Sequence, residues 1–113
     1  MKIILPGNPI STNQIYRRHG HTIYMSNEGK ARKEYYQLVA KSQSEGRMPL
    51  TRLVKVRIKL FFKDKRVRDI DNYCKILLDS LTGIVWVDDK QIQRMTVEKS
   101  IDAVQPRIEI EII

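Results

Sequence analysis

The segment Leu53–Phe61 constrains the fold most, because apolar and basic side chains alternate in it without a break. The apolar positions are Val54, Val56, Ile58 and Leu60, and the basic positions between them are Lys55, Arg57 and Lys59. Successive side chains of a β-strand point to opposite faces, so a period of two predicts a strand. We therefore expect one face of this strand to lie in the core and the other to be basic.

The C-terminal segment repeats this alternation with the opposite charge. Isoleucines at positions 108, 110 and 112 alternate with Glu109 and Glu111. If this strand pairs with the segment 53–61, glutamates and basic residues meet across the sheet as cross-strand partners. We therefore favour a solvated, charge-matched sheet face, with a DNA-binding platform as the alternative.

Three N-terminal segments have clear boundaries. Residues 2–5 predict a short strand that stops at Pro6, and residues 10–25 predict two short extended pieces around a turn at Gly20. A helix should begin after the N-cap residue Ser26 and stop near Gly46. Its apolar stripe is expected to comprise Ala31, Tyr35, Leu38 and Val39.

A second helix is predicted for residues 72–82, ended by Gly83 and followed by a strand-like run at 84–87. No repeat or linker divides the chain, and 113 residues suit one domain spanning residues 1–113. These elements predict an α+β fold, a mixed β-sheet with two main helices packed on it.

The charge balance indicates a polyanionic partner. The chain has 21 Lys and Arg residues against 13 Asp and Glu, a formal net charge of +8. Nucleic acid is the first candidate and an anionic membrane surface the second. No segment has the roughly 18 to 20 consecutive apolar residues of a membrane span, and the apolar run 3–5 is too short for the apolar region of a signal peptide, so we expect a cytoplasmic protein.

A basic run follows the strand 53–61, with Lys63, Lys65, Arg66 and Arg68 around Asp64. Neither a strand nor a helix period fits it, so it predicts an exposed loop. Cations on such a loop can follow a phosphate backbone, although they can also merely solubilise the protein.

Asp69 and Asp71 come directly after this run. On an extended segment, residues i and i+2 share a face with Cα atoms roughly 6 to 7 Å apart. Two such carboxylates repel unless a cation joins them, and Mg²⁺ prefers oxygen ligands of this kind. The alternative is that one aspartate merely caps the following helix.

A third carboxylate can join this pair. A helix of about eleven residues is near 16 Å long, and a returning strand over 84–87 would bring Asp88 and Asp89 back to the level of Asp69 and Asp71. Lys75, four residues after Asp71, either forms an ordinary surface ion pair with it or faces the charge that develops on a phosphate.

The segments RVRDIDNYCKILLDSLTG and VWVDDKQI resemble the RusA family of Holliday-junction resolvases. The family pattern is a basic run, D-x-D-N, a lysine after two further residues, and an aromatic-apolar stretch that ends in D-D-x-Q. Upstream, Asn13, Tyr16 and Arg17 in TNQIYRR and the S-x-E-G helix start at Ser26 also resemble the family. The resemblance covers about residues 3 to 112.

The resemblance implies a homodimeric endonuclease, dependent on Mg²⁺ with Mn²⁺ as a substitute, that makes paired nicks in four-way DNA junctions. By position, Asp69, Asp71 and Asp89 match the essential carboxylates and Lys75 the essential lysine, whereas Asp88 is the less important of its pair. The family often occurs in prophages, which suggests a role in phage-derived recombination or DNA repair.

The expected DNA contacts are Lys63, Lys65, Arg66 and Arg68, with Arg17, Tyr16 and Asn13 as further candidates. Tyr16 would either stack on a base or simply pack. Two alternatives remain open: a non-catalytic nucleic-acid-binding module in which the aspartates only cap a helix, and a nuclease that prefers flap or fork DNA.

Overall fold

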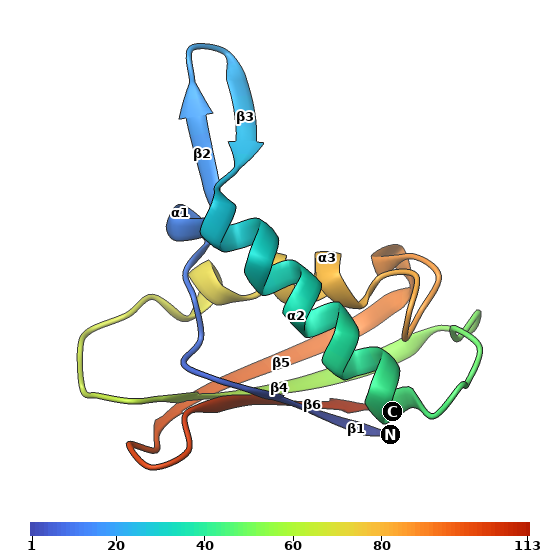
Figure 1. Ribbon diagram of the computed structural model, residues 1–113. Helices are drawn as coiled ribbons and strands as arrows, with labels where there is room; N and C mark the ends of the chain where they lie inside the picture. The colour runs from blue at the N-terminus through green and yellow to red at the C-terminus, as the bar shows by residue number, and fades with distance from the viewer.

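A computed structural model, which describes residues 1–113, contains a four-stranded mixed sheet with its helices on one face (Figure 1). The strands are β1 (Lys2–Pro6), β4 (Val54–Phe62), β5 (Ile92–Ile101) and β6 (Arg107–Ile112). Their order in the sheet is β1-β6-β4-β5. β6 is antiparallel to both of its neighbours, and β4 and β5 are parallel. The predicted α+β fold with a mixed sheet is confirmed.

The alternating strand β4 lies at the centre of the core. Val54, Val56, Ile58 and Leu60 are each at most 2% exposed. The isoleucines of β6 join them on the same face, because Ile58 is opposite Ile110 and Leu60 is opposite Ile108. The period of two therefore identified both the strand and its buried face.

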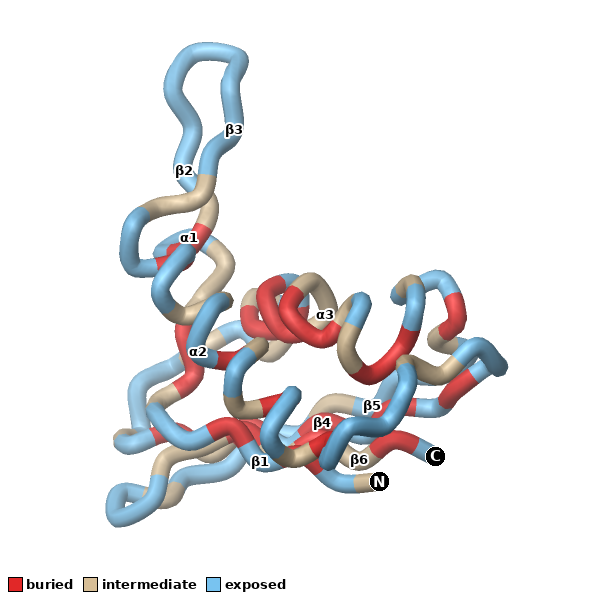
Figure 2. The backbone as a smooth tube through the Cα atoms, turned by 45° about the vertical axis from the view of Figure 1, so that its right-hand side comes forward, coloured by how far each residue is buried: buried red, intermediate tan, exposed pale blue.

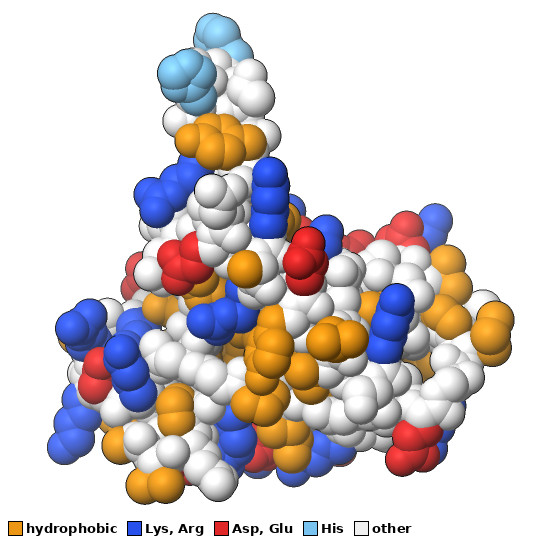
Figure 3. Space-filling model, in the orientation of Figure 1, with side chains coloured by type: hydrophobic (Ala, Val, Ile, Leu, Met, Phe, Trp, Pro, Cys, Tyr) orange, Lys and Arg blue, Asp and Glu red, His pale blue; other side chains and the backbone are white.

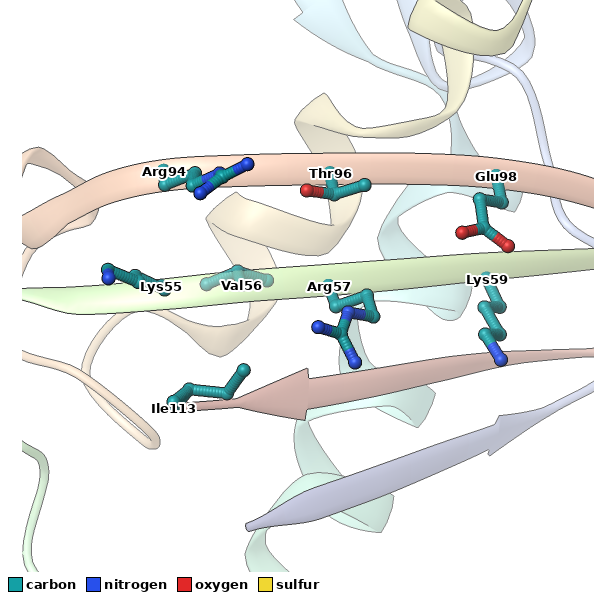
Figure 4. Close-up of a pocket in the computed structure, with 8 residues that line it drawn as sticks. All are labelled: Lys55, Val56, Arg57, Lys59, Arg94, Thr96, Glu98 and Ile113. Carbon is teal, nitrogen blue, oxygen red and sulfur yellow. The ribbon is translucent and has the colours of Figure 1, made fainter.

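The outer face of the sheet carries no helix, and charges are matched there between β4 and β6, whereas Lys55 of β4 is opposite Arg94 of β5. Arg57 is opposite Glu111, with 3.7 Å between nitrogen and oxygen, and Lys59 is opposite Glu109. Figure 4 shows the basic side chains of β4 on this face, next to Arg94, Thr96 and Glu98 of β5. The predicted cross-strand pairing of basic and acidic residues is confirmed.

Two main helices cover the other face, as predicted (Figures 1 and 2). They are α2 (Asn27–Ser44) and α3 (Lys75–Leu81). Ser26 caps α2, since its Oγ accepts a hydrogen bond of 3.0 Å from the N–H of Gly29. Gly46, at φ 75°, follows the last turn of α2 in the left-handed conformation that glycine favours. None of the helices is long and apolar enough to cross a membrane.

Of the predicted apolar stripe of α2, only Val39 packs against the core, and the other three positions are exposed. Leu38 is 69% exposed, and the buried residues are Gly29, Tyr36, Ala40 and Ser44. A Cβ atom on Gly29 would lie 2.7 Å from Ile15 Cγ2 and 2.9 Å from the Ile15 backbone. Small residues let this face of α2 approach its neighbours closely, so it is buried although it carries fewer large apolar side chains.

The predicted strand at 84–87 was also wrong, because this segment is a tight turn. The N–H of Gly83 donates to the Trp86 carbonyl at 2.7 Å, and the N–H of Val85 donates to the Leu81 carbonyl at 2.9 Å. Trp86 is fully buried and donates from Nε1 to Thr82 Oγ1 at 3.0 Å. The chain therefore does not return along α3 before it enters β5.

A hairpin projects from the body of the protein (Figures 1 and 2). It consists of β2 (Tyr16–His19) and β3 (Thr22–Met25), joined through Gly20 at φ 61°. These are the two extended pieces that the sequence predicted. A short helix, α1 (Thr12–Ile15), precedes them and was not predicted.

Candidate active site

The basic loop at residues 63–68 leaves the end of β4 without regular structure, as predicted. Lys63, Lys65 and Arg66 are exposed, and the Arg66 side chain is 80% exposed. Exposed cations of this kind are the groups that contact a phosphate backbone. Their role in binding DNA stays a prediction.

Arg68 is turned inward and holds the loop together. Its side chain is 11% exposed, its Nη2 donates to Asp64 Oδ1 at 2.7 Å, and its guanidinium lies 4.4 Å from the centre of the Phe62 ring. Asp64 also accepts from the N–H of Arg66. This backbone hydrogen bond, followed by the one from Arg68, lowers the pKa of Asp64. Asp64 therefore organises the basic run that it interrupts in sequence.

Asp69 and Asp71 lie on a tighter turn than expected. Residues Ile70–Tyr73 form a 3₁₀ turn, η1, so the aspartates do not share an extended segment. Neither carboxylate caps η1 or α3, and neither takes part in a hydrogen bond or an ion pair within the chain. Both residues are exposed. Two free carboxylates beside a basic loop are better explained as ligands of a cation than as helix caps.

Lys75, the first residue of α3, pairs with Asp79 and not with Asp71. Its Nζ lies 3.6 Å from Asp79 Oδ2 and 5.1 Å from the centre of the Tyr16 ring. The Tyr16 hydroxyl donates to the same carboxylate oxygen of Asp79. Partial burial and then the Asp79 carboxylate raise the pKa of Tyr16. Tyr16 therefore packs against α3, and a lysine, a tyrosine and an aspartate form one cluster.

The short helix α1 joins this cluster to the aspartate turn. Thr12 Oγ1 donates to the Asn72 carbonyl at 2.7 Å, so α1 lies against η1. Asn13 is exposed on α1, and Arg17 is exposed on β2. The structure thus brings the upstream motif beside Asp69, Asp71 and Lys75.

Asp88 and Asp89 have different local roles. Asp88 caps the 3₁₀ turn η2 (Asp89–Gln91), since its Oδ1 accepts from the N–H of Lys90 at 2.9 Å. That hydrogen bond lowers the pKa of Asp88. Gln91 completes the cap and donates to the carbonyls of Leu50 and Arg52. Asp89 is exposed and forms no ion pair.

Within one chain, Asp89 lies far from Asp69 and Asp71. Asp89 comes shortly before Ile92, which is paired with Val54 at the start of β4. Near the other end of β4, Leu60 is paired with Lys99. The Lys99 side chain donates to the carbonyl of Arg68, the residue before Asp69. Positions 54 and 60 are about 20 Å apart along β4. Figure 1 shows η1 in yellow and η2 in orange at opposite ends of α3. No group of three metal-ligating side chains forms within the chain. The expected return of Asp88 and Asp89 is wrong because residues 84–87 turn.

Two residues of this site were missed from the sequence. Asp79 holds both Lys75 and Tyr16, and Thr12 ties α1 to η1. The spacing of four between Lys75 and Asp79 was a usable signal for an ion pair on a helix. Thr12 offered none, because its partner is 60 residues away.

The fold and the site indicate a protein that acts on DNA. Free carboxylates, a lysine and a basic loop occur together in a chain with a net charge of +8. The model of the family described as Endodeoxyribonuclease RusA matches residues 6–113. The chain therefore belongs to the RusA family of endodeoxyribonucleases, and the predicted resemblance and enzyme class are confirmed.

Curated relatives agree with this assignment. The crossover junction endodeoxyribonuclease RusA of Escherichia coli (strain K12) is 35% identical over 91 residues, which cover 80% of this chain and 74% of that protein. The protein of the same name from Enterobacteria phage 82 has the same identity and coverage. The one from Enterobacteria phage HK97 is 32% identical over 115 residues, 98% of this chain and 92% of that protein.

Proposed function

We propose that this protein resolves four-way DNA junctions by paired, metal-dependent nicks. The observation that carries the proposal is the pair of free carboxylates, Asp69 and Asp71, beside Lys75 in a member of the RusA family. The names of its relatives support a junction as substrate. A preference for flap or fork DNA is the alternative that the substrate assay separates.

The donor set fits a hard divalent cation, because exposed carboxylate oxygens are the ligands that Mg²⁺ takes. Asp69, Asp71 and Asp89 would hold Mg²⁺, or Mn²⁺ in its place, and the bound ion would activate water and neutralise charge on the phosphate.

The remaining residues bind and orient the DNA. Lys75, which contacts Asp79 and Tyr16, would stabilise the charge that grows on the attacked phosphate. Lys63, Lys65 and Arg66 bind flanking phosphates from the exposed loop. Arg17 and Asn13 are further candidates for DNA contacts.

We further propose a homodimer in which each site draws on both chains. Within one chain, the β4 positions next to Asp89 and next to the basic loop, 54 and 60, are about 20 Å apart, and Asp69 and Asp71 follow that loop. Asp89 of the second subunit can supply the third carboxylate without refolding of the turn at 84–87. A dimer also provides two related sites for two strands of a symmetric junction.

The main test incubates end-labelled four-way junction, linear duplex and flap DNA with the protein in Mg²⁺ or EDTA. We expect paired, symmetric nicks in the junction only, and only with the metal. The matched variants are Asp89→Asn, which should lower the cleavage rate at least 100-fold, and Asp88→Asn, which should keep it because asparagine preserves the cap. Tight binding without cleavage by the wild-type protein would instead support a non-catalytic binding module.

The shared site is tested by mixing two inactive chains. If each site uses both chains, a mixed dimer of Asp71→Asn and Asp89→Asn subunits contains one intact site, so the mixture should nick one strand per junction. If each site lies within one chain, both sites of the mixed dimer are defective and the mixture should stay inactive. Sedimentation of the wild-type protein should give about twice the chain mass of 13.3 kDa.

A further inference from the structure

The hairpin β2–β3 exposes apolar side chains that nothing in the chain covers. Ile23 is 63% exposed and Tyr24 is 49% exposed, although both lie in a strand. Figure 3 shows the hairpin standing clear of the body, with the histidines at its tip and apolar and basic side chains below them. A two-stranded hairpin is only marginally stable alone in water, so this one must be anchored to the rest of the protein. Its exposed apolar side chains indicate a surface that binds a partner.

The anchor lies at the base of the hairpin. The N–H of Ser26 donates to the Ile15 carbonyl at 2.7 Å, and Ser26 Oγ donates to the Gln14 carbonyl at 2.7 Å. Gly29 lies directly against Ile15, where a side chain would not fit. Tyr16 ties the start of β2 to Asp79 of α3. The hairpin is thus fixed at one end and free at the other.

The charge of the hairpin identifies the kind of partner. Residues 16–25 contain Arg17, Arg18, His19 and His21 and no acidic residue. In the register of the hairpin, Arg17 is opposite Tyr24 and Arg18 is opposite Ile23, so each face presents a cation beside an apolar side chain. This combination fits a polyanion that also exposes flat apolar surface. Unstacked nucleic-acid bases beside their phosphates have both properties.

We propose that the hairpin binds the branch point of the DNA, where Tyr24 stacks on a base that has lost its stacking neighbour and Arg17 contacts the adjacent phosphate. An intact duplex offers phosphates but no free base face, so Tyr24 adds affinity only where base stacking is interrupted. This inference rests on the proposed function, because it takes a DNA junction as the substrate. It adds that the hairpin, which lies outside the carboxylate site, recognises the branch point.

The location of the hairpin fits this role. Tyr16, at the base of the hairpin, packs against Lys75, so the hairpin begins next to the proposed catalytic lysine. From Tyr16 to His19 the strand spans about 10 Å. A base held by the hairpin would therefore place nearby phosphates of the same strand within reach of Lys75.

The test measures binding in EDTA, where no cleavage is expected, to a four-way junction and to a duplex of equal length. Tyr24→Ala and Tyr24→Leu should each weaken junction binding about tenfold, as expected when one base–aromatic stack is lost, and leave duplex binding unchanged. Tyr24→Phe should bind the junction like wild type, because it keeps the stacking ring. Tyr35→Ala removes an exposed tyrosine of α2 and serves as the matched control, with no expected change.

A second readout uses 2-aminopurine at the branch point, whose fluorescence changes when the base leaves the helical stack. Wild type and Tyr24→Phe should change this signal, and Tyr24→Leu should not. If Tyr24→Leu keeps both the signal and the preference for the junction, the hairpin does not recognise the branch point. Failure of the proposed function would differ, because the wild-type protein would then not nick the junction at all in Mg²⁺.

Discussion

At the scale of single residues, the position of the site depends on very close contacts. Gly29 leaves room for Ile15. The neighbours of Ile15 in sequence make the next contacts: the Gln14 carbonyl accepts from Ser26, and the Tyr16 hydroxyl donates to Asp79. The absence of one side chain on α2 thus fixes how α1 and the hairpin meet α3. Alanine would ordinarily be the better helix former at this position.

Gly29→Ala should therefore destabilise the protein, although it improves helix propensity by up to about 1 kcal/mol. The new Cβ would lie 2.9 Å from the backbone of Ile15, which cannot move as a flexible side chain can. We expect a net loss of about 1 to 3 kcal/mol, measured by urea unfolding. The exposed position Lys30→Ala is the control, and equal stability of both variants would show that α1 yields to the added methyl group.

At the scale of elements, the basic loop separates cations that face solvent from one that shapes the loop. Arg66 extends outward, whereas Arg68 lies on Phe62 and binds Asp64. The two arginines are two residues apart in sequence, so they form a matched pair for experiment. Their different surroundings predict different consequences of the same substitution.

Arg66→Ala should reduce the slope of log affinity against log salt by about 0.9 for both duplex and junction, and leave the melting temperature unchanged. Arg68→Ala should instead cost about 1 to 2 kcal/mol of stability, because it removes a charged hydrogen bond and an arginine–aromatic contact. Salt-dependent binding and thermal melts measure the two effects. If Arg68→Ala melts like wild type and lowers the slope instead, Arg68 is a phosphate ligand.

At the scale of the whole molecule, ion pairs join the N-terminal strand to the C-terminal one. Glu109 of β6 accepts from Lys2 of β1 at 3.0 Å and from Arg107 at 2.7 Å. The hydrogen bond with Lys2, and then the one with Arg107, lower the pKa of Glu109 below its usual value of 4.5. A carboxylate with a lowered pKa stabilises the fold above its unfolded pKa, and this contribution is lost as the pH falls through the folded pKa.

Glu109→Gln should therefore lower stability by up to about 1 kcal/mol at pH 7, and the difference from wild type should shrink once the pH falls below the usual glutamate range. Melting temperatures between pH 7 and pH 2 measure this convergence. Glu111→Gln is the control, because Glu111 is nearly half exposed and lies 3.7 Å from Arg57. A constant gap between Glu109→Gln and wild type over the whole range would contradict the assignment.

The sequence by itself determined the features that depend on local pattern. The alternation at 53–61 and 108–112 identified both core strands and their charge-matched outer face, and the cap at Ser26 identified the start of α2. The D-x-D-N and D-D-x-Q segments identified the family. These signals are local because side-chain period and capping act over a few residues.

Only the tertiary structure decided how the distant parts combine. The edge strand β5 went unpredicted, since most of its side chains are exposed and it lacks a strict alternation. The turn at 84–87 forms because Trp86 is buried and hydrogen-bonded to Thr82, and it keeps Asp89 away from Asp69 and Asp71. Asp79 binds Tyr16 as well as Lys75 only because the fold brings the start of β2 against α3. Such contacts depend on packing between segments up to 63 residues apart, which no local pattern encodes.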